Sequence, residues 1–156
     1  MKKILLLAII AISAFTFSSC SKDDDSSSSE QYVEFTFDGS TYRGTGLLSI
    51  EAYFSGYNTT VACQQSGYYF WIEIPGNSTG TFSKSTVDAA MTVEAPEGNY
   101  DAYYEDGMQT SFTINVTEYN DYIKGTFNGT VEGGSSGEEV KSVSGSFNVK
   151  VVDESY

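Results

Sequence analysis

The chain has no histidine, two cysteines, two prolines and one tryptophan among its 156 residues. Without histidine there is no imidazole to act as a general base, to activate a serine or cysteine nucleophile, or to bind a metal ion. A zinc site is excluded for the same reason, because such sites are built mainly from cysteine and histidine. We therefore expect a protein that is not an enzyme and that carries no resident cofactor.

Basic residues are also scarce, with 8 Lys and Arg against 21 Asp and Glu. Loss of the first 19 residues would remove Lys2 and Lys3 but no acid, which leaves 6 basic residues and a net charge of −15. This charge argues against nucleic acid as a partner, because phosphates need basic patches. It also argues against a basic face for anionic lipid headgroups, but it is compatible with a cation, with a basic partner, or with a role in solubility alone.

Residues 1–19 have the pattern of a secretion signal. Lys2 and Lys3 provide a positive start, and an apolar stretch runs from Ile4 to Phe17. This stretch is shorter than the roughly 20 apolar residues that a membrane-spanning helix needs, so it fits the apolar region of a signal peptide. The signal ends at Cys20, directly after two serines.

The same leader resembles a bacterial lipoprotein signal, in which cleavage occurs just before a cysteine. The resemblance implies that Cys20 becomes the first residue and receives acyl chains such as palmitate, although Phe17 stands where the family usually has Leu. Two or three long acyl chains anchor a protein far more firmly than a single myristoyl chain. The alternative is an ordinary secretory leader that is cut elsewhere, with a coincidental cysteine.

An acidic, serine-rich segment follows the cysteine and is expected to form a disordered tether over residues 20–30. A flexible segment of this length spans roughly 18 Å. Its beginning is similar to the export signal of surface lipoproteins in the Bacteroidota, and this similarity implies that the mature protein lies on the outer face of the outer membrane. The alternative is a linker that is merely solvated and carries no export signal. The residues that carry this similarity are Lys22, Asp23, Asp24 and Asp25.

Residues 31–156 match one domain of ordinary size, and their hydrophobic pattern alternates with the period of a β-strand. Turn residues separate short alternating runs, which predicts an all-β domain: a single antiparallel β-sandwich, with a β-barrel as the alternative. Residues 84–91 fit least well and leave room for one short helical turn. Cys63 has no disulfide partner once Cys20 is acylated, and we expect it to be a small buried side chain on a strand. The positions predicted to face the core are Val33, Phe35, Phe37, Leu48, Ile50, Ala52, Phe54, Tyr68, Phe70, Ile72, Ile74, Met91, Val93, Ala95, Phe112, Ile114 and Val116.

A repeated motif predicts the register of a C-terminal hairpin. Gly125-Thr126-Phe127-Asn128 recurs as Gly145-Ser146-Phe147-Asn148, with a glycine- and serine-rich loop over residues 133–137 between them. Folding the chain at this loop places Phe127 opposite Gly145 and Phe147 opposite Gly125. Each ring would then cover the bare backbone of the opposite glycine, which is known as aromatic rescue. On the same face fall Ile123, Val131, Val143, Val149 and Val151.

These motifs also carry a resemblance to a family. Phe37-Asp38-Gly39 with Tyr42, Thr117-Glu118-Tyr119, and the repeated Gly-Thr-Phe and Gly-Ser-Phe segments resemble small, uncharacterised β-rich surface lipoproteins of the Bacteroidota. The resemblance implies an all-β fold. It implies no activity, so it assigns no functional residues.

Three kinds of site can be considered from the residues alone. Exposed aromatic rings could stack on a sugar or bind a protein, and the candidates are Tyr69, Trp71, Tyr103 and Tyr104; a structural role in the core is the alternative. Oxygen ligands for Ca²⁺ crowd one loop at Glu97, Asp101, Glu105 and Asp106, where a solvated acidic loop is the simpler interpretation. Paired carboxylates such as Glu51 and Glu73 would be needed for a glycan hydrolase, which is the weakest hypothesis.

We therefore expect a lipid-anchored protein of the outer membrane that faces the cell exterior and acts as a non-enzymatic binding or accessory module. Its partner would be a protein or a glycan. The main alternative is a structural component of a surface assembly, which would show an exposed strand edge or an outward apolar stripe.

Overall fold

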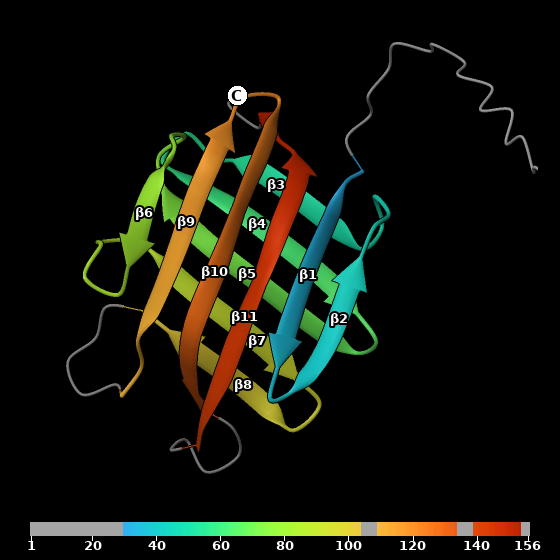
Figure 1. Ribbon diagram of the computed structural model, residues 1–156, viewed down its shortest axis with the longest axis vertical. Helices are drawn as coiled ribbons and strands as arrows, with labels where there is room; N and C mark the ends of the chain where they lie inside the picture. The colour runs from blue at the N-terminus through green and yellow to red at the C-terminus, as the bar shows by residue number, and fades with distance from the viewer. Residues whose placement is uncertain (1–29, 104–108, 134–138, 154–156) are drawn as a thin grey trace, which may run out of the picture.

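The computed structural model describes residues 30–103, 109–133 and 139–153, and these residues form twelve strands and no helix (Figure 1). The predicted all-β class is confirmed. The leader and nearly all of the tether, including Cys20 and the acidic residues after it, lie outside the described residues. The strands are β1 (Tyr32–Phe37), β2 (Ser40–Gly44), β3 (Ile50–Phe54), β4 (Asn58–Gln65), β5 (Tyr68–Pro75), β6 (Gly80–Ser83), β7 (Ala90–Ala95), β8 (Gly98–Ala102), β9 (Phe112–Tyr119), β10 (Tyr122–Gly133), β11 (Glu139–Lys150) and β12 (Val152–Asp153).

The strands form two layers that cross each other, as Figure 1 shows. The front layer has the order β6-β9-β10-β11-β1-β2, and the rear layer has the order β12-β3-β4-β5-β7-β8. The far end of β10 joins the layers, because Glu132 and Gly133 pair with Asp101 and Tyr100 of β8. The result is a sandwich that is nearly closed into a barrel. One pair departs from the predicted antiparallel arrangement, since β12 runs parallel to β3.

The alternation predicted from the sequence places the core between the two layers. The inward residues of β1, β5 and β9 are buried, while their neighbours face outward. Leu48 is an exception. It was expected to face the core, but it lies in the turn before β3 and is fully exposed. A hydrogen-bonded turn from Gly46 to Ser49 delays the start of the strand to Ile50.

The C-terminal hairpin has the predicted register. Phe127 of β10 pairs with Gly145 of β11, and Gly125 pairs with Phe147. A Cβ atom at Gly145 would lie 2.6 Å from Cζ of Phe127, and one at Gly125 would lie 2.5 Å from Cζ of Phe147. Each ring therefore occupies the space that a side chain on the opposite strand would fill.

Backbone atoms of the neighbouring strands also leave no room for a side chain at Gly125 or Gly145. A Cβ at Gly145 would collide with the backbone carbonyl of Glu34 in β1, and one at Gly125 would collide with the carbonyl of Asn115 in β9. Backbone cannot move aside as a side chain can. The two glycines therefore allow four adjacent strands, β9, β10, β11 and β1, to curve closely around the core.

Aromatic rings connect the two layers through the middle of the core. Phe70 of the rear strand β5 stacks on Phe127 of β10 and on Phe35 of β1, with ring centroids 4.7 and 5.0 Å apart. Phe147 stacks behind Phe127 at 6.4 Å. Each such pair contributes about 0.5–1.5 kcal/mol beyond the burial of its surface. All four phenylalanines are at most 2 % exposed, so this stack is the centre of the hydrophobic core.

Replacing Gly145 by Ala should lower the free energy of unfolding by about 1–3 kcal/mol, because the new methyl group overpacks a site closed by Phe127 and by the backbone of Glu34. Gly46→Ala is the matched control. A Cβ there would meet nothing nearer than Oγ of Ser49 at 3.9 Å, so its effect should stay within about 0.5 kcal/mol. Urea denaturation of both variants measures the difference. Equal effects of the two substitutions would contradict the packing described.

Candidate functional site

Two of the predicted aromatic residues lie side by side on the outward face of the rear layer. Phe70 and Ile72 of β5 point into the core, so Tyr69 and Trp71 between them point outward, and both are half-buried. Their ring centroids are 5.2 Å apart. The hydroxyl of Tyr69 donates a hydrogen bond of 3.3 Å to Oε1 of Glu51. Burial, helped by the charge of Glu51, raises the pKa of Tyr69 to about 12.

A groove of about 460 Å³ runs beside Trp71. Its lining includes Trp71, Tyr103, which follows β8, and Val87 in the connection from β6 to β7. Tyr103 is 40 % exposed and Val87 is 70 % exposed. Three segments that are distant in the sequence thus meet here. The remaining lining residues are Glu73, Asp88, Ala89, Ala90 and Thr92.

The groove combines apolar sides with negative charge. Glu73 and Asp88 contribute carboxylates, and no Lys or Arg is among the described residues that line it. Thr92, which also lines the groove, is buried and donates a hydrogen bond of 2.8 Å from Oγ1 to Oδ1 of Asp101. Apolar walls with a few fixed polar groups are typical of ligand sites, and the volume lies within their usual range of about 300–1,000 Å³.

Of the four predicted aromatics, the structure brings Trp71 and Tyr103 together in this groove. Tyr69 contacts Trp71 but lines a different depression. Tyr104 lies outside the described residues. No pattern in the sequence points to Val87 and Asp88, because they belong to residues 84–91, where the strand alternation is weakest and one short helical turn is the expectation. The structure has hydrogen-bonded turns there and no helix.

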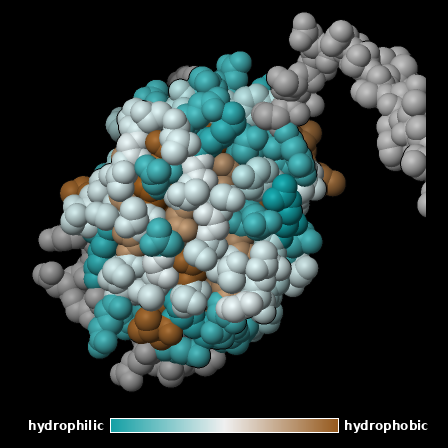
Figure 2. Space-filling model, in the orientation of Figure 1, coloured by the Kyte–Doolittle hydropathy of each residue, from teal (hydrophilic) through white to brown (hydrophobic). Residues whose placement is uncertain are grey.

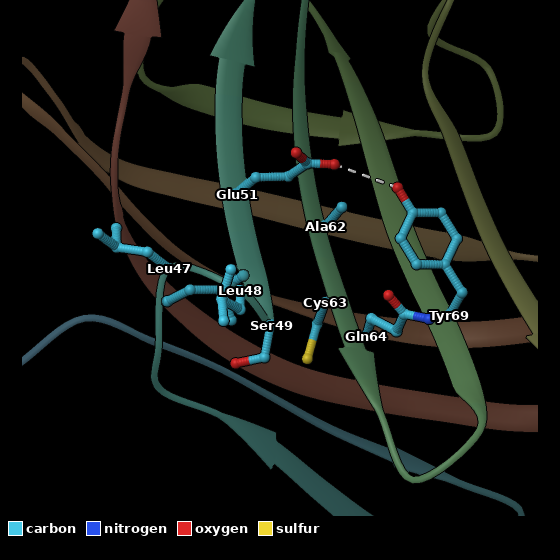
Figure 3. A pocket seen from close by; sticks show the side chains of 9 residues that line it. Leu47, Leu48, Ser49, Glu51, Ala62, Cys63, Gln64 and Tyr69 are labelled. Carbon is cyan, nitrogen blue, oxygen red and sulfur yellow. Dashed lines mark hydrogen bonds between the residues drawn. The ribbon is translucent and has the colours of Figure 1, made fainter.

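The second depression is small, about 120 Å³, and Figure 3 shows the side chains around it. Tyr69 and Glu51 lie on one side, and Leu47 and Leu48 on the other. Cys63 of β4 lies between them but is only 1 % exposed. Burial raises the pKa of its thiol to about 11, which makes it a poor nucleophile at neutral pH. The prediction that Cys63 is a buried small side chain on a strand is confirmed.

The carboxylates predicted to bind calcium have other partners where the structure describes them. Glu97 forms an ion pair of 3.3 Å with Nζ of Lys141, and Asp101 accepts the hydrogen bond from Thr92. Glu105 and Asp106 lie outside the described residues. Over the described part of the chain, no group of three or more His, Cys, Asp or Glu side chains is arranged to hold a metal ion.

Lys141 places a positive charge beside Glu97, one of the residues predicted to bind calcium. Its side chain is only 10 % exposed, and its ammonium group lies 3.4 Å from Asp38 and 3.6 Å from Glu139, in addition to Glu97. The same group lies 4.9 Å from the ring centroid of Tyr100, close enough for a cation–π contact. Burial lowers the pKa of Lys141, but hydrogen bonds to Tyr100 and Glu97 and the charge of Glu139 outweigh it, so the pKa is raised above its ordinary value. The lysine therefore stabilises the closed end of the barrel around Tyr100.

The two carboxylates considered for hydrolysis do not share a depression. Glu73 lines the groove, whereas Glu51 lines the small pocket and accepts the hydrogen bond from Tyr69. A glycosidase needs both groups on opposite sides of one scissile bond. The geometry therefore gives no support to a mechanism through this pair.

Comparison with known proteins finds no matching family model, no similar curated protein and no matching solved structure. Within the part of the chain that the structure describes, no helix has the length and apolar character needed to span a membrane.

The buried thiol predicts a specific loss of stability in alkaline solution. The pKa of Cys63 rises from its ordinary value of 9.0 to about 11 on folding. The unfolded chain releases the thiol proton at a lower pH than the folded chain does. The contribution of the thiol to the free energy of unfolding is therefore complete below pH 9 and disappears as the pH rises to about 11. Cys63→Ala lacks this contribution. The difference in Tm between the wild type and the variant should therefore shrink from pH 8 to pH 11.

Melting curves followed by circular dichroism over this range measure the difference. Tyrosines such as Tyr69 titrate in both proteins, so their effect cancels in the comparison. A difference in Tm that stays constant from pH 8 to pH 11 would show that the thiol is not buried as described.

Proposed function

We propose that the protein is a non-enzymatic binding module, held at the outer membrane by a lipid on Cys20, that binds a neutral glycan in the groove beside Trp71. The leader pattern and its resemblance to lipoprotein signals support the anchor. The observation that supports the ligand is the groove itself, which is lined by the aromatic rings of Trp71 and Tyr103 together with the carboxylates of Glu73 and Asp88.

The chemistry of the groove suits a sugar. A pyranose ring has apolar C–H faces that can stack on an indole or a phenol ring, and hydroxyl groups around its edge. Glu73 and Asp88 can accept hydrogen bonds from such hydroxyls, and charged acceptors make these bonds stronger than neutral ones. A glycan that carries carboxylate or sulfate groups would be repelled by the same side chains. The preferred ligand is therefore uncharged.

Binding is favoured over catalysis by the arrangement of the carboxylates. Glu51 and Glu73 line separate depressions, and the chain has no histidine to take over a proton transfer. The sandwich holds Trp71 in the middle of a five-residue pairing between β5 and β7, so the stacking surface is fixed before a ligand arrives. A preformed site of this kind binds without the cost of ordering a loop.

The single tryptophan makes the proposal directly measurable, because Trp71 is the only indole in the chain. Titration with neutral hexasaccharides of glucose, mannose and xylose should shift the emission of Trp71 for at least one of them. Tyr103→Ala should weaken that binding by roughly 1–3 kcal/mol, the usual effect of losing a stacked ring at a binding site. Isothermal titration calorimetry measures the affinity of each variant.

Tyr57→Ala is the matched control, since Tyr57 is 86 % exposed in the turn between β3 and β4 and does not line the groove. Its affinity should equal that of the wild type. Polygalacturonate, an acidic polymer, should not bind. Equal binding of neutral and acidic polymers, or no change of Trp71 emission with any of them, would refute a glycan site at this groove.

A further inference from the structure

The turn between β2 and β3 exposes two adjacent leucines to solvent. Leu48 is 100 % exposed and Leu47 is 85 % exposed. In Figure 2, hydrophobic atoms project from the edge of the molecule where this turn lies. Two adjacent leucines held in water are unusual, because apolar surface of this kind normally marks an interaction site.

The turn is well defined and does not allow the leucines to fold inward freely. The amides of Ser49 and Ile50 donate hydrogen bonds of 2.8 and 3.0 Å to the carbonyl of Gly46. The hydroxyl of Ser49 donates a further bond of 3.0 Å to the same carbonyl. Leu47 and Leu48 occupy the two central positions of this closed turn, so their side chains project away from the barrel.

The turn lies at the point where the tether enters the domain. Gly44, the last residue of β2, pairs with Val33 at the start of β1, and Figure 1 shows the turn beside that end of β1. The base of the tether is fixed there as well. Glu30 forms an ion pair of 3.3 Å with Arg43, and its carbonyl accepts a hydrogen bond of 2.9 Å from Asn148 of β11.

We propose that Leu47 and Leu48 dip into the outer part of the bilayer to which Cys20 is anchored, and so fix how the domain sits on the membrane. This inference rests on the lipid anchor of the proposed function. Nine residues, 21–29, separate Cys20 from Glu30, and the flexible tether that the sequence predicts there would span roughly 18 Å. The bilayer is therefore always within reach of the turn, which makes insertion an intramolecular event at high effective concentration.

The charge around the turn fits a membrane better than other partners. Residues 44–50 contain no charged side chain, in a chain with 21 acidic residues. The nearby carboxylate of Glu51, which lines the same small depression, points toward the hydroxyl of Tyr69 and away from the leucines, so the leucines can enter an apolar layer without it. A second copy of the chain is a weaker candidate, because two side chains provide far less than the roughly 1,000 Å² that a stable interface buries.

The test places a fluorescent label beside the leucines in the complete, acylated protein. Thr45→Cys lies directly before the closed turn, and Ser40→Cys lies at the opposite end of β2, five residues earlier and about 17 Å away at 3.3 Å per residue. Cys20 carries lipid and Cys63 is buried, so only the introduced thiol reacts. Each labelled protein is reconstituted into phosphatidylcholine vesicles that contain a lipid with a quencher on its acyl chain.

Quenching should be several-fold stronger at position 45 than at position 40. The double variant L47Q/L48Q in the Thr45→Cys background should lose this excess while its Tm stays unchanged, because both leucines are exposed. Equal quenching at the two positions, or quenching that persists in L47Q/L48Q, overturns the inference while leaving the anchor intact. Wild-type protein that fails to sediment with the vesicles overturns both the anchor and the inserted turn.

Discussion

The structure depends on two phenylalanine rings that each lie over a glycine of the neighbouring strand. Phe127 covers Gly145 and Phe147 covers Gly125, and the carbonyls of Glu34 and Asn115 close the other side of these glycines. Because no side chain separates the strands there, β9, β10, β11 and β1 can bend as one curved layer. Phe127 stacks on Phe70 and so connects this layer to the rear one, with Phe147 stacked behind Phe127.

This packing also determines which side chains are left outside. With Phe70 held in the aromatic stack, the alternation along β5 places Tyr69 and Trp71 on the outer surface. Pairing of β5 with β7 sets Trp71 opposite Thr92, and both residues line the groove. At the other end of the front layer, the start of β1 pairs with the end of β2, directly before the turn that carries Leu47 and Leu48. The core thus orients both the groove and the proposed membrane contact.

The hairpin register could be predicted because a repeated motif and a period of two leave only one pairing that keeps every large residue inside. Strand β4 could not be recognised in this way, since five successive residues, 59–63, are buried and the alternation disappears. Trp71 was predictable as an outward residue, but its neighbours Val87 and Asp88 were not, because only long-range pairing brings them together. Nor does local sequence reveal that Lys141 reaches Glu97 across the closed end.

Nuclear magnetic resonance tests the central claim most directly. If each ring lies over its glycine, the Hα protons of Gly125 and Gly145 stand in the shielding region of an aromatic ring. Their resonances should then move upfield, with cross-relaxation between the Phe127 ring and Gly145 Hα and between the Phe147 ring and Gly125 Hα. Glycine resonances at ordinary positions, with no such cross-peaks, would contradict the packing and with it the outward placement of Trp71.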